Sequence, residues 1–201
     1  MRRLALTLLL IAALPLSAAD VEVGVHHLGA IMTGKTNVPG GGTLDIGESR
    51  GFGATAELFW SPRISTQFAA TFLNPVAILE PIDLDLNTIG IDIYSADVRY
   101  HFAPERRWSA FVGAGGAVVS LGNLEDRFAD NVELRFDPQT TFLAETGVRF
   151  RVRPRIVVDA NLTYVALEAD ARVVRNNNGI AVPSQIRLNP VTVSLGATWR
   201  F

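Results

Sequence analysis

The last eleven residues of the chain alternate without a break between apolar and non-apolar side chains and end on an aromatic residue. The apolar set is Val191, Val193, Leu195, Ala197, Trp199 and Phe201, and the other set is Thr192, Ser194, Gly196, Thr198 and Arg200. Successive side chains of a β-strand point to opposite faces, so this pattern predicts a strand with one apolar and one polar face. The strand is expected to meet an oily environment on one side and a polar one on the other.

The same alternation recurs along the chain. It is clear at residues 52–60, 94–102, 141–152 and 156–164, and weaker at 21–31, 64–73 and 108–121. Leu143 and Thr146 are the exceptions in their segment. With the last segment, the chain contains eight expected strands, and an even number of strands suits a closed bacterial barrel.

The connections between these strands alternate strictly in length. Residues 33–49, 74–89, 122–139 and 169–185 are long connections, whereas 61–63, 103–107 and 153–155 are short. Outer-membrane barrels combine short periplasmic turns with longer outer loops, and a soluble sandwich has no reason to do so. Residues 82–86 alternate as well, which indicates either strands that continue above the membrane or a segment that lines an entry funnel for apolar molecules.

Aromatic residues gather at the ends of the expected strands. One group lies near the short turns or the C-terminus: Trp60, Phe102, Trp108, Phe150, Trp199 and Phe201. Amphipathic rings prefer the level of the lipid headgroups, so this group predicts an interfacial belt. A soluble barrel would instead keep its large apolar side chains inside. The sequence therefore predicts an all-β fold, an eight-stranded antiparallel transmembrane β-barrel, over residues 20–201.

The N-terminus has the features of a secretory signal peptide. Arg2 and Arg3 precede an apolar run at residues 4–16, and Ser17, Ala18 and Ala19 provide small residues for cleavage. The run is shorter than the about 20 residues that a membrane-spanning helix needs. We therefore expect residues 1–19 to direct export by the Sec route. Without Arg2 and Arg3, the 18 basic residues fall to 16 against 20 acidic ones, a balance that gives no indication of nucleic-acid binding.

Several segments together carry a family resemblance. They are residues 20–25 (DVEVGV), 100–102 (YHF), 111–115 (FVGAG), 186–191 (IRLNPV) and 196–201 (GATWRF). Their order and spacing resemble the OmpW family of small outer-membrane proteins over essentially the whole mature chain. The resemblance implies a narrow barrel in the Gram-negative outer membrane, in contact with lipid and lipopolysaccharide, with a hydrophobic passage that opens laterally to small apolar molecules. The ending with Trp199 and Phe201 also resembles the closing strand that the barrel-assembly machinery reads.

No motif indicates catalysis, a cofactor or a metal. Gly113, Gly115 and Gly116 lie inside a strand pattern without a following helix or lysine, so a phosphate-binding loop is not indicated. The three histidines are not clustered with carboxylates in the sequence, and cysteine is absent. We therefore expect a protein that is not an enzyme and that needs neither cofactor nor metal.

The polar faces of the expected strands carry charges: Glu57, Asp97, Arg99, Glu145, Arg149, Asp159 and Arg200. The interior of an eight-stranded barrel is just wide enough for side chains to fill it. Opposite charges there would pair as a plug, or alternatively line a gated passage. Either arrangement excludes a wide aqueous pore.

The tetrapeptide Leu-Asn-Pro-Val occurs twice and places Pro75 and Pro190 near the outer ends of strands. Proline cannot donate to a β-ladder, so each copy predicts a loosened seam and a possible lateral portal. Two functions follow: passive passage of small hydrophobic molecules with lateral release, or a sealed structural barrel that displays its outer loops to partners or lipopolysaccharide. The sequence leaves the substrate, the gate and the oligomeric state open.

Overall fold

The computed structural model describes residues 20–32, 35–37, 43–80, 84–88, 90–122, 124–125, 132–175 and 180–201. The expected signal peptide at residues 1–19 lies outside this part of the chain. Within it, no helix is long and apolar enough to cross a membrane. The strands are β1 (Asp20–Met32), β2 (Lys35–Asn37), β3 (Thr43–Ile46), β4 (Ser49–Ser61), β5 (Ile64–Leu73), β6 (Val76–Glu80), β7 (Leu84–Thr88), β8 (Ile91–Phe102), β9 (Trp108–Leu121), β10 (Leu124–Glu125), β11 (Val132–Phe136), β12 (Gln139–Arg153), β13 (Ile156–Val165), β14 (Glu168–Arg175), β15 (Ile180–Arg187) and β16 (Pro190–Arg200).

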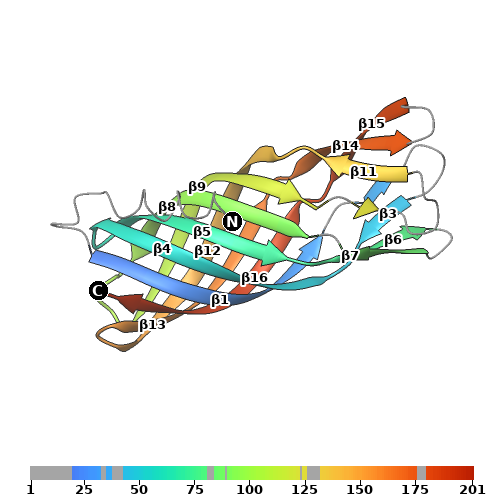
Figure 1. The fold of residues 1–201 in the computed structure, drawn as a ribbon. Helices are drawn as coiled ribbons and strands as arrows, with labels where there is room; N and C mark the ends of the chain where they lie inside the picture. Colours follow the sequence, from blue (N-terminus) through green and yellow to red (C-terminus); the bar gives the residue numbers. More distant parts are fainter. Residues whose placement is uncertain are drawn as a thin grey trace.

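Eight of these strands form a closed antiparallel barrel (Figure 1). Their order around the barrel is β1-β16-β13-β12-β9-β8-β5-β4, and the pairing of β4 with β1 closes the ring. β16 pairs with β1 on one side and with β13 on the other, so the alternating C-terminal segment is the closing strand. The prediction of an eight-stranded barrel is confirmed, and each expected strand appears at its place in the sequence.

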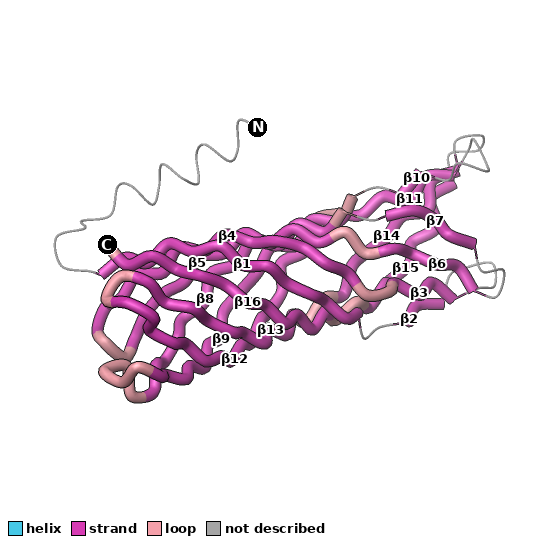
Figure 2. Tube along the Cα trace, turned by 90° about the horizontal axis from the view of Figure 1, so that it is seen from below, coloured by secondary structure: helices cyan, strands magenta, loops and turns pink. Residues whose placement is uncertain are grey.

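The connections expected as long loops contain further strands. β2, β3, β6 and β7 form one four-stranded sheet, and β10, β11, β14 and β15 form another. Figure 2 shows these strands extending beyond the barrel at the end opposite the C-terminus. The alternation at residues 82–86 indicated this extension, and its described part lies in β7. The barrel wall therefore continues outward as two separate sheets.

The two faces of the barrel wall differ as the alternation predicted. On β16, Val193 and Leu195 are exposed on the outside, whereas Thr192, Ser194 and Thr198 are buried inside. The six aromatic residues assigned to one belt lie beside the short turns or at the C-terminus, and Trp60 and Trp108 are each 63% exposed. Apolar side chains on the outside remain exposed, which is the arrangement that a lipid environment requires.

Local contacts fix the short turns that end the barrel on this side. The Ser61 hydroxyl accepts hydrogen bonds from the backbone N–H groups of Arg63 and Ile64, at 3.3 and 3.1 Å. Ala103 adopts a left-handed backbone conformation with φ of 47°, which lets β8 reverse into β9 within five residues. Tight turns of this kind mark the periplasmic end of such a barrel.

Candidate functional site

The outer half of the barrel interior is apolar. Residues near the outer ends of the strands point inward and bury one another, which forms an apolar layer across the lumen. The apolar layer comprises Leu28, Ala30, Met32, Leu73, Ile91, Ile93, Ala117, Val119, Leu121, Leu143, Val165, Leu167 and Leu188. Here the inward positions depart from the polar character that the alternation predicted, and Leu143, an exception in the sequence pattern, belongs to this layer.

The periplasmic half of the interior is filled by ionisable side chains, which we call the charged layer. It consists of Glu22, Glu57, Asp97, Arg99, Glu145, Arg149, Asp159 and Arg200. All are buried except Arg200, whose side chain is 27% exposed. An eight-stranded interior has room for little else, so these side chains close the lumen below the apolar layer.

Arg99 is the centre of one half of the charged layer. Its guanidinium donates to both carboxylate oxygens of Glu145, with Nη2 2.8 Å from Oε2. Nε also lies 3.2 Å from Asp97 Oδ2, Nη1 lies 3.7 Å from Glu57 Oε2, and the group stacks 4.4 Å from the ring centre of Phe111. Asp97 and Glu145 therefore depend on this one cation, and Glu57 shares it with a second arginine.

Glu22 and Glu57 connect the rest of the charged layer. Glu22 accepts hydrogen bonds from Arg149 and from Arg200, whose Nε is 2.7 Å from Oε1. Arg149 Nη1 also lies 3.5 Å from Glu57 Oε2, which joins this half to Arg99. Glu57 Oε1 accepts from Ser65 at 2.5 Å and lies 3.0 Å from His101 Nε2. The network spans the barrel from β1 to β12.

A small cavity of about 60 Å³ lies where the two layers meet. His26, Asp97, Glu145 and Asn161 contribute polar groups to its wall, and Leu28 and Ile93 contribute apolar ones. His26 Nδ1 lies 3.2 Å from Asp159 Oδ1, and Nε2 lies 3.0 Å from the Thr55 hydroxyl. A cavity of this size accommodates a few water molecules but not a drug-sized compound.

The structure brings together all seven charges that the sequence placed on the polar faces. Six are fully buried inside the barrel, and Arg200 points into the same end. Sequence reasoning missed Glu22, His26, Ser65 and His101 as members of this network. Glu22 carried a signal, because it alternates with Val21 and Val23 at the start of β1.

Glycines on the inward face make room for these large side chains. A Cβ atom on Gly113 would lie 2.8 Å from Glu145 Oε1 and 3.1 Å from Arg99 Cγ, and one on Gly196 would overlap the His26 ring. Any larger residue at these positions would therefore displace the charged layer. The glycine-rich segment of β9 thus serves lumen packing.

The two expected portal prolines lie at different places in the outer wall. Both are fully buried. Pro190 is the first residue of β16 and pairs with Met32 at the outer end of β1. Pro75 lies between β5 and β6. β5 pairs with β4 and β8, and β6 pairs with β3 and β7, so both strands have a neighbour on each side. Each Leu-Asn-Pro-Val copy therefore marks the joint between a barrel strand and an outer strand, but only Pro190 borders a boundary between the two outer sheets.

That boundary is one of two seams in the outer wall. β2 and β15 continue the paired barrel strands β1 and β16, yet they belong to different sheets, and we call this boundary the first seam. β7 and β10, which continue β8 and β9, are divided in the same way at a second seam. Below the second seam, the ladder ends where the Gly122 N–H donates to the Gly90 carbonyl at 2.7 Å. Among the described residues, no ladder crosses either seam.

Trp199 and Phe201, the expected assembly signal, lie at the periplasmic end of the closing strand. Trp199 is 45% exposed and Phe201 is 75% exposed. The Phe201 N–H donates to the carbonyl of Val21 at 2.9 Å, so the last residue is tied to the first barrel strand. Recognition of these residues by assembly machinery stays a prediction.

Comparison with solved structures identifies the same architecture. OprG from Pseudomonas aeruginosa matches with a TM-score of 0.80 and 11% identity, over 92% of this chain and 96% of that one. The outer membrane protein AlkL, solved in DMPC bilayers, matches with a TM-score of 0.66 and 18% identity, over 91% and 90% of the two chains. Escherichia coli outer membrane protein W matches with a TM-score of 0.54 and 15% identity, over 90% of this chain and 97% of that one. At these identities the likeness shows the fold.

The family follows from the sequence itself. No curated protein matches the chain significantly. The profile of the OmpW family, however, matches residues 19–201, which include every described strand. The match agrees with the barrel fold, with its exposed apolar outer surface and with the similar solved structures, which are outer membrane proteins. The protein therefore belongs to the OmpW family and is an eight-stranded barrel of the Gram-negative outer membrane.

Proposed function

We propose that the barrel gives small hydrophobic molecules passive passage from the outer surface into the outer membrane, with lateral release at the first seam. The apolar layer offers such a molecule a favourable environment, because it removes apolar surface from water. The charged layer directly below offers none, since an apolar molecule would have to separate buried ion pairs. The way onward from the apolar layer is therefore sideways.

The observation that carries this proposal is the position of Pro190. It is buried beside the apolar layer, two residues after Leu188, and it stands at the foot of the first seam. On the other side of β16, between β13 and β14, the Leu167 carbonyl accepts from the N–H groups of Leu188 and Asn189, at 3.0 and 3.5 Å. Asn189 has a left-handed backbone conformation with φ of 36°. The ladder is thus irregular at the level where an apolar molecule would leave.

Pro190→Val tests this exit. Valine supplies the backbone N–H that proline lacks. Because the even-numbered residues of β16 donate towards β13, as Arg200 does to the Arg155 carbonyl, the variant is expected to extend the ladder between β16 and β13 beside the foot of the seam. Cells carrying the variant should accumulate a small hydrophobic fluorophore more slowly than cells with the native barrel. Folding, measured by heat-modifiable gel mobility, should be equal or better.

Pro75→Val is the matched control, because it changes the same residue in the same tetrapeptide inside a continuous sheet. It should leave uptake at the native rate. If both variants lower the uptake rate equally, the loss comes from changing the joint between a barrel strand and an outer strand, not from changing the seam. If the native barrel gives no compound-specific uptake above an unrelated eight-stranded barrel, the sealed structural alternative holds and passage is rejected.

A further inference from the structure

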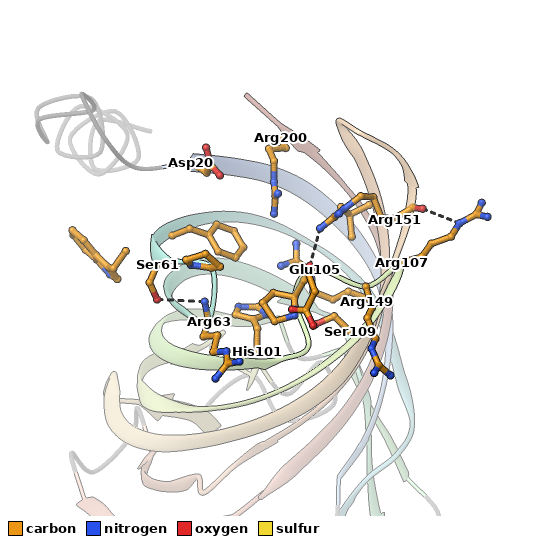
Figure 3. A pocket seen from close by; sticks show the side chains of 16 residues that line it. Asp20, Ser61, Arg63, His101, Glu105, Arg107, Ser109, Arg149, Arg151 and Arg200 are labelled. Carbon is orange, nitrogen blue, oxygen red and sulfur yellow. Dashed lines mark hydrogen bonds between the residues drawn. The ribbon is translucent and has the colours of Figure 1, made fainter.

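A second and larger cavity opens at the periplasmic end of the barrel, on the far side of the charged layer from the apolar layer. Its volume is about 620 Å³, within the range of sites for small organic ligands. Six arginines line it: Arg63, Arg106, Arg107, Arg149, Arg151 and Arg200. The acidic residues in its wall are Asp20 and Glu105 (Figure 3). The whole chain is net acidic, so this concentration of positive charge is local.

The two deepest arginines are already compensated. Arg149 pairs with Glu22 and Glu57, and Arg200 pairs with Glu22. They belong to the charged layer and form the floor of the cavity together with the ring of Phe59, over which both guanidinium groups lie at 5.4 and 5.2 Å. Their charge is therefore not available to a ligand in full.

The other four arginines are not neutralised by any described carboxylate. Arg151 Nη2 donates to the Pro104 carbonyl at 2.9 Å, and Arg107 Nε donates to the Arg151 carbonyl at 3.3 Å. A carbonyl oxygen holds a guanidinium in position without cancelling its charge. Arg63 and Arg106 lie on the two turns that border the cavity and pair with no carboxylate among the described residues. The mouth thus carries an excess of positive charge.

Guanidinium groups bind phosphate and carboxylate through paired N–H donors. A carboxylate brings one negative charge, whereas a phosphate group brings up to about two charges and three acceptor oxygens. The Arg107 guanidinium lies over the Phe150 ring, 4.6 Å from its centre, so Arg63, Arg106 and Arg151 are the uncompensated cations that a ligand in the cavity would meet. More than one negative charge is needed to match them, which favours a ligand with two adjacent phosphate groups. We propose that the periplasmic mouth binds a small anion that carries two or more phosphate groups, a site separate from the apolar passage above the charged layer.

The test is calorimetric titration of the full barrel, in phosphatidylcholine nanodiscs, with inorganic pyrophosphate. The native barrel should bind one pyrophosphate with a saturable isotherm. Arg63→Gln and Arg106→Gln should each weaken binding by about tenfold or more, because each removes a charged hydrogen-bond donor. Both residues lie on exposed turns, so the barrel should still fold, which gel mobility reports.

Arg153→Gln is the matched control, since Arg153 is exposed at the same end of the barrel but does not line the cavity. It should change the affinity little. Absence of saturable binding to the native barrel would overturn the proposal, and so would an equal loss in Arg153→Gln, which would indicate diffuse attraction. Nanodiscs with cardiolipin, a lipid that carries two phosphate groups, distinguish the source: competition with pyrophosphate would identify a lipid headgroup as the ligand, and its absence would identify a soluble anion.

Discussion

Arg99→Met is expected to lower the free energy of unfolding of the barrel by about 3–5 kcal/mol, the cost typical of removing one partner from a buried ion pair. Methionine nearly fills the space of the arginine stem but leaves Glu145, Asp97 and Glu57 facing one another inside the barrel. Urea titration of the barrel folded in lipid vesicles measures the loss. It should appear as a shift of the midpoint with little change in slope.

Two further variants separate charge from packing. Arg153→Met removes an exposed arginine outside the charged layer and should cost less than about 0.5 kcal/mol. Adding Glu145→Leu to Arg99→Met should recover part of the loss, because the bidentate partner is removed as well. A double variant that loses the full sum of both single effects would contradict the assignment of Arg99 as the compensating cation.

Leu195→Arg should also be strongly destabilising, by about 2–4 kcal/mol, the cost of a cation at the lipid face near the bilayer midplane. Leu195 lies in the middle of β16, is 63% exposed and points away from the lumen. The free energy of folding into vesicles measures this cost.

Ile64→Arg gives the control for depth. Ile64 lies on the same outer face, but at the start of β5 beside a periplasmic turn, where a cation should cost about 0–1 kcal/mol. Equal costs at Leu195 and Ile64 would mean that the barrel does not sit in the membrane at the assigned level.

The eight barrel strands could be predicted from the sequence because each has one face in lipid and, along much of its length, one polar face. That pattern ends near the outer side, where both faces are apolar. In β1, the segment from His27 to Met32 places Leu28, Ala30 and Met32 inside while Ile31 is exposed outside. Without alternation, the sequence gives no sign of which residues point inward. The sequence pattern therefore did not predict that these residues form an apolar layer inside the barrel.

The charged side chains could be predicted, but their partners could not. Glu22 and Arg149 are 127 positions apart and meet only because the barrel closes with a particular register. That register sets which inward residues of β1, β4, β8 and β12 share one level. The outer sheets were indicated at residues 82–86. Residues 132–136 (VELRF), which form β11, alternate in the same way, but they lie inside a connection that was expected to be a loop.

The central claim is that an apolar molecule leaves the barrel sideways into lipid rather than downward through the charged layer. Asymmetric vesicles can test this route directly if lipopolysaccharide forms the outer leaflet and phospholipid forms the inner leaflet. The native barrel is inserted with its outer sheets facing the external solution. A lipid-anchored energy acceptor in the inner leaflet reports arrival of a hydrophobic fluorophore in the membrane, and trapped albumin reports arrival in the aqueous interior. The account predicts that the barrel accelerates the membrane signal first, with the albumin signal following it. An albumin signal that rises before the membrane signal would show passage through the charged layer and would contradict the account.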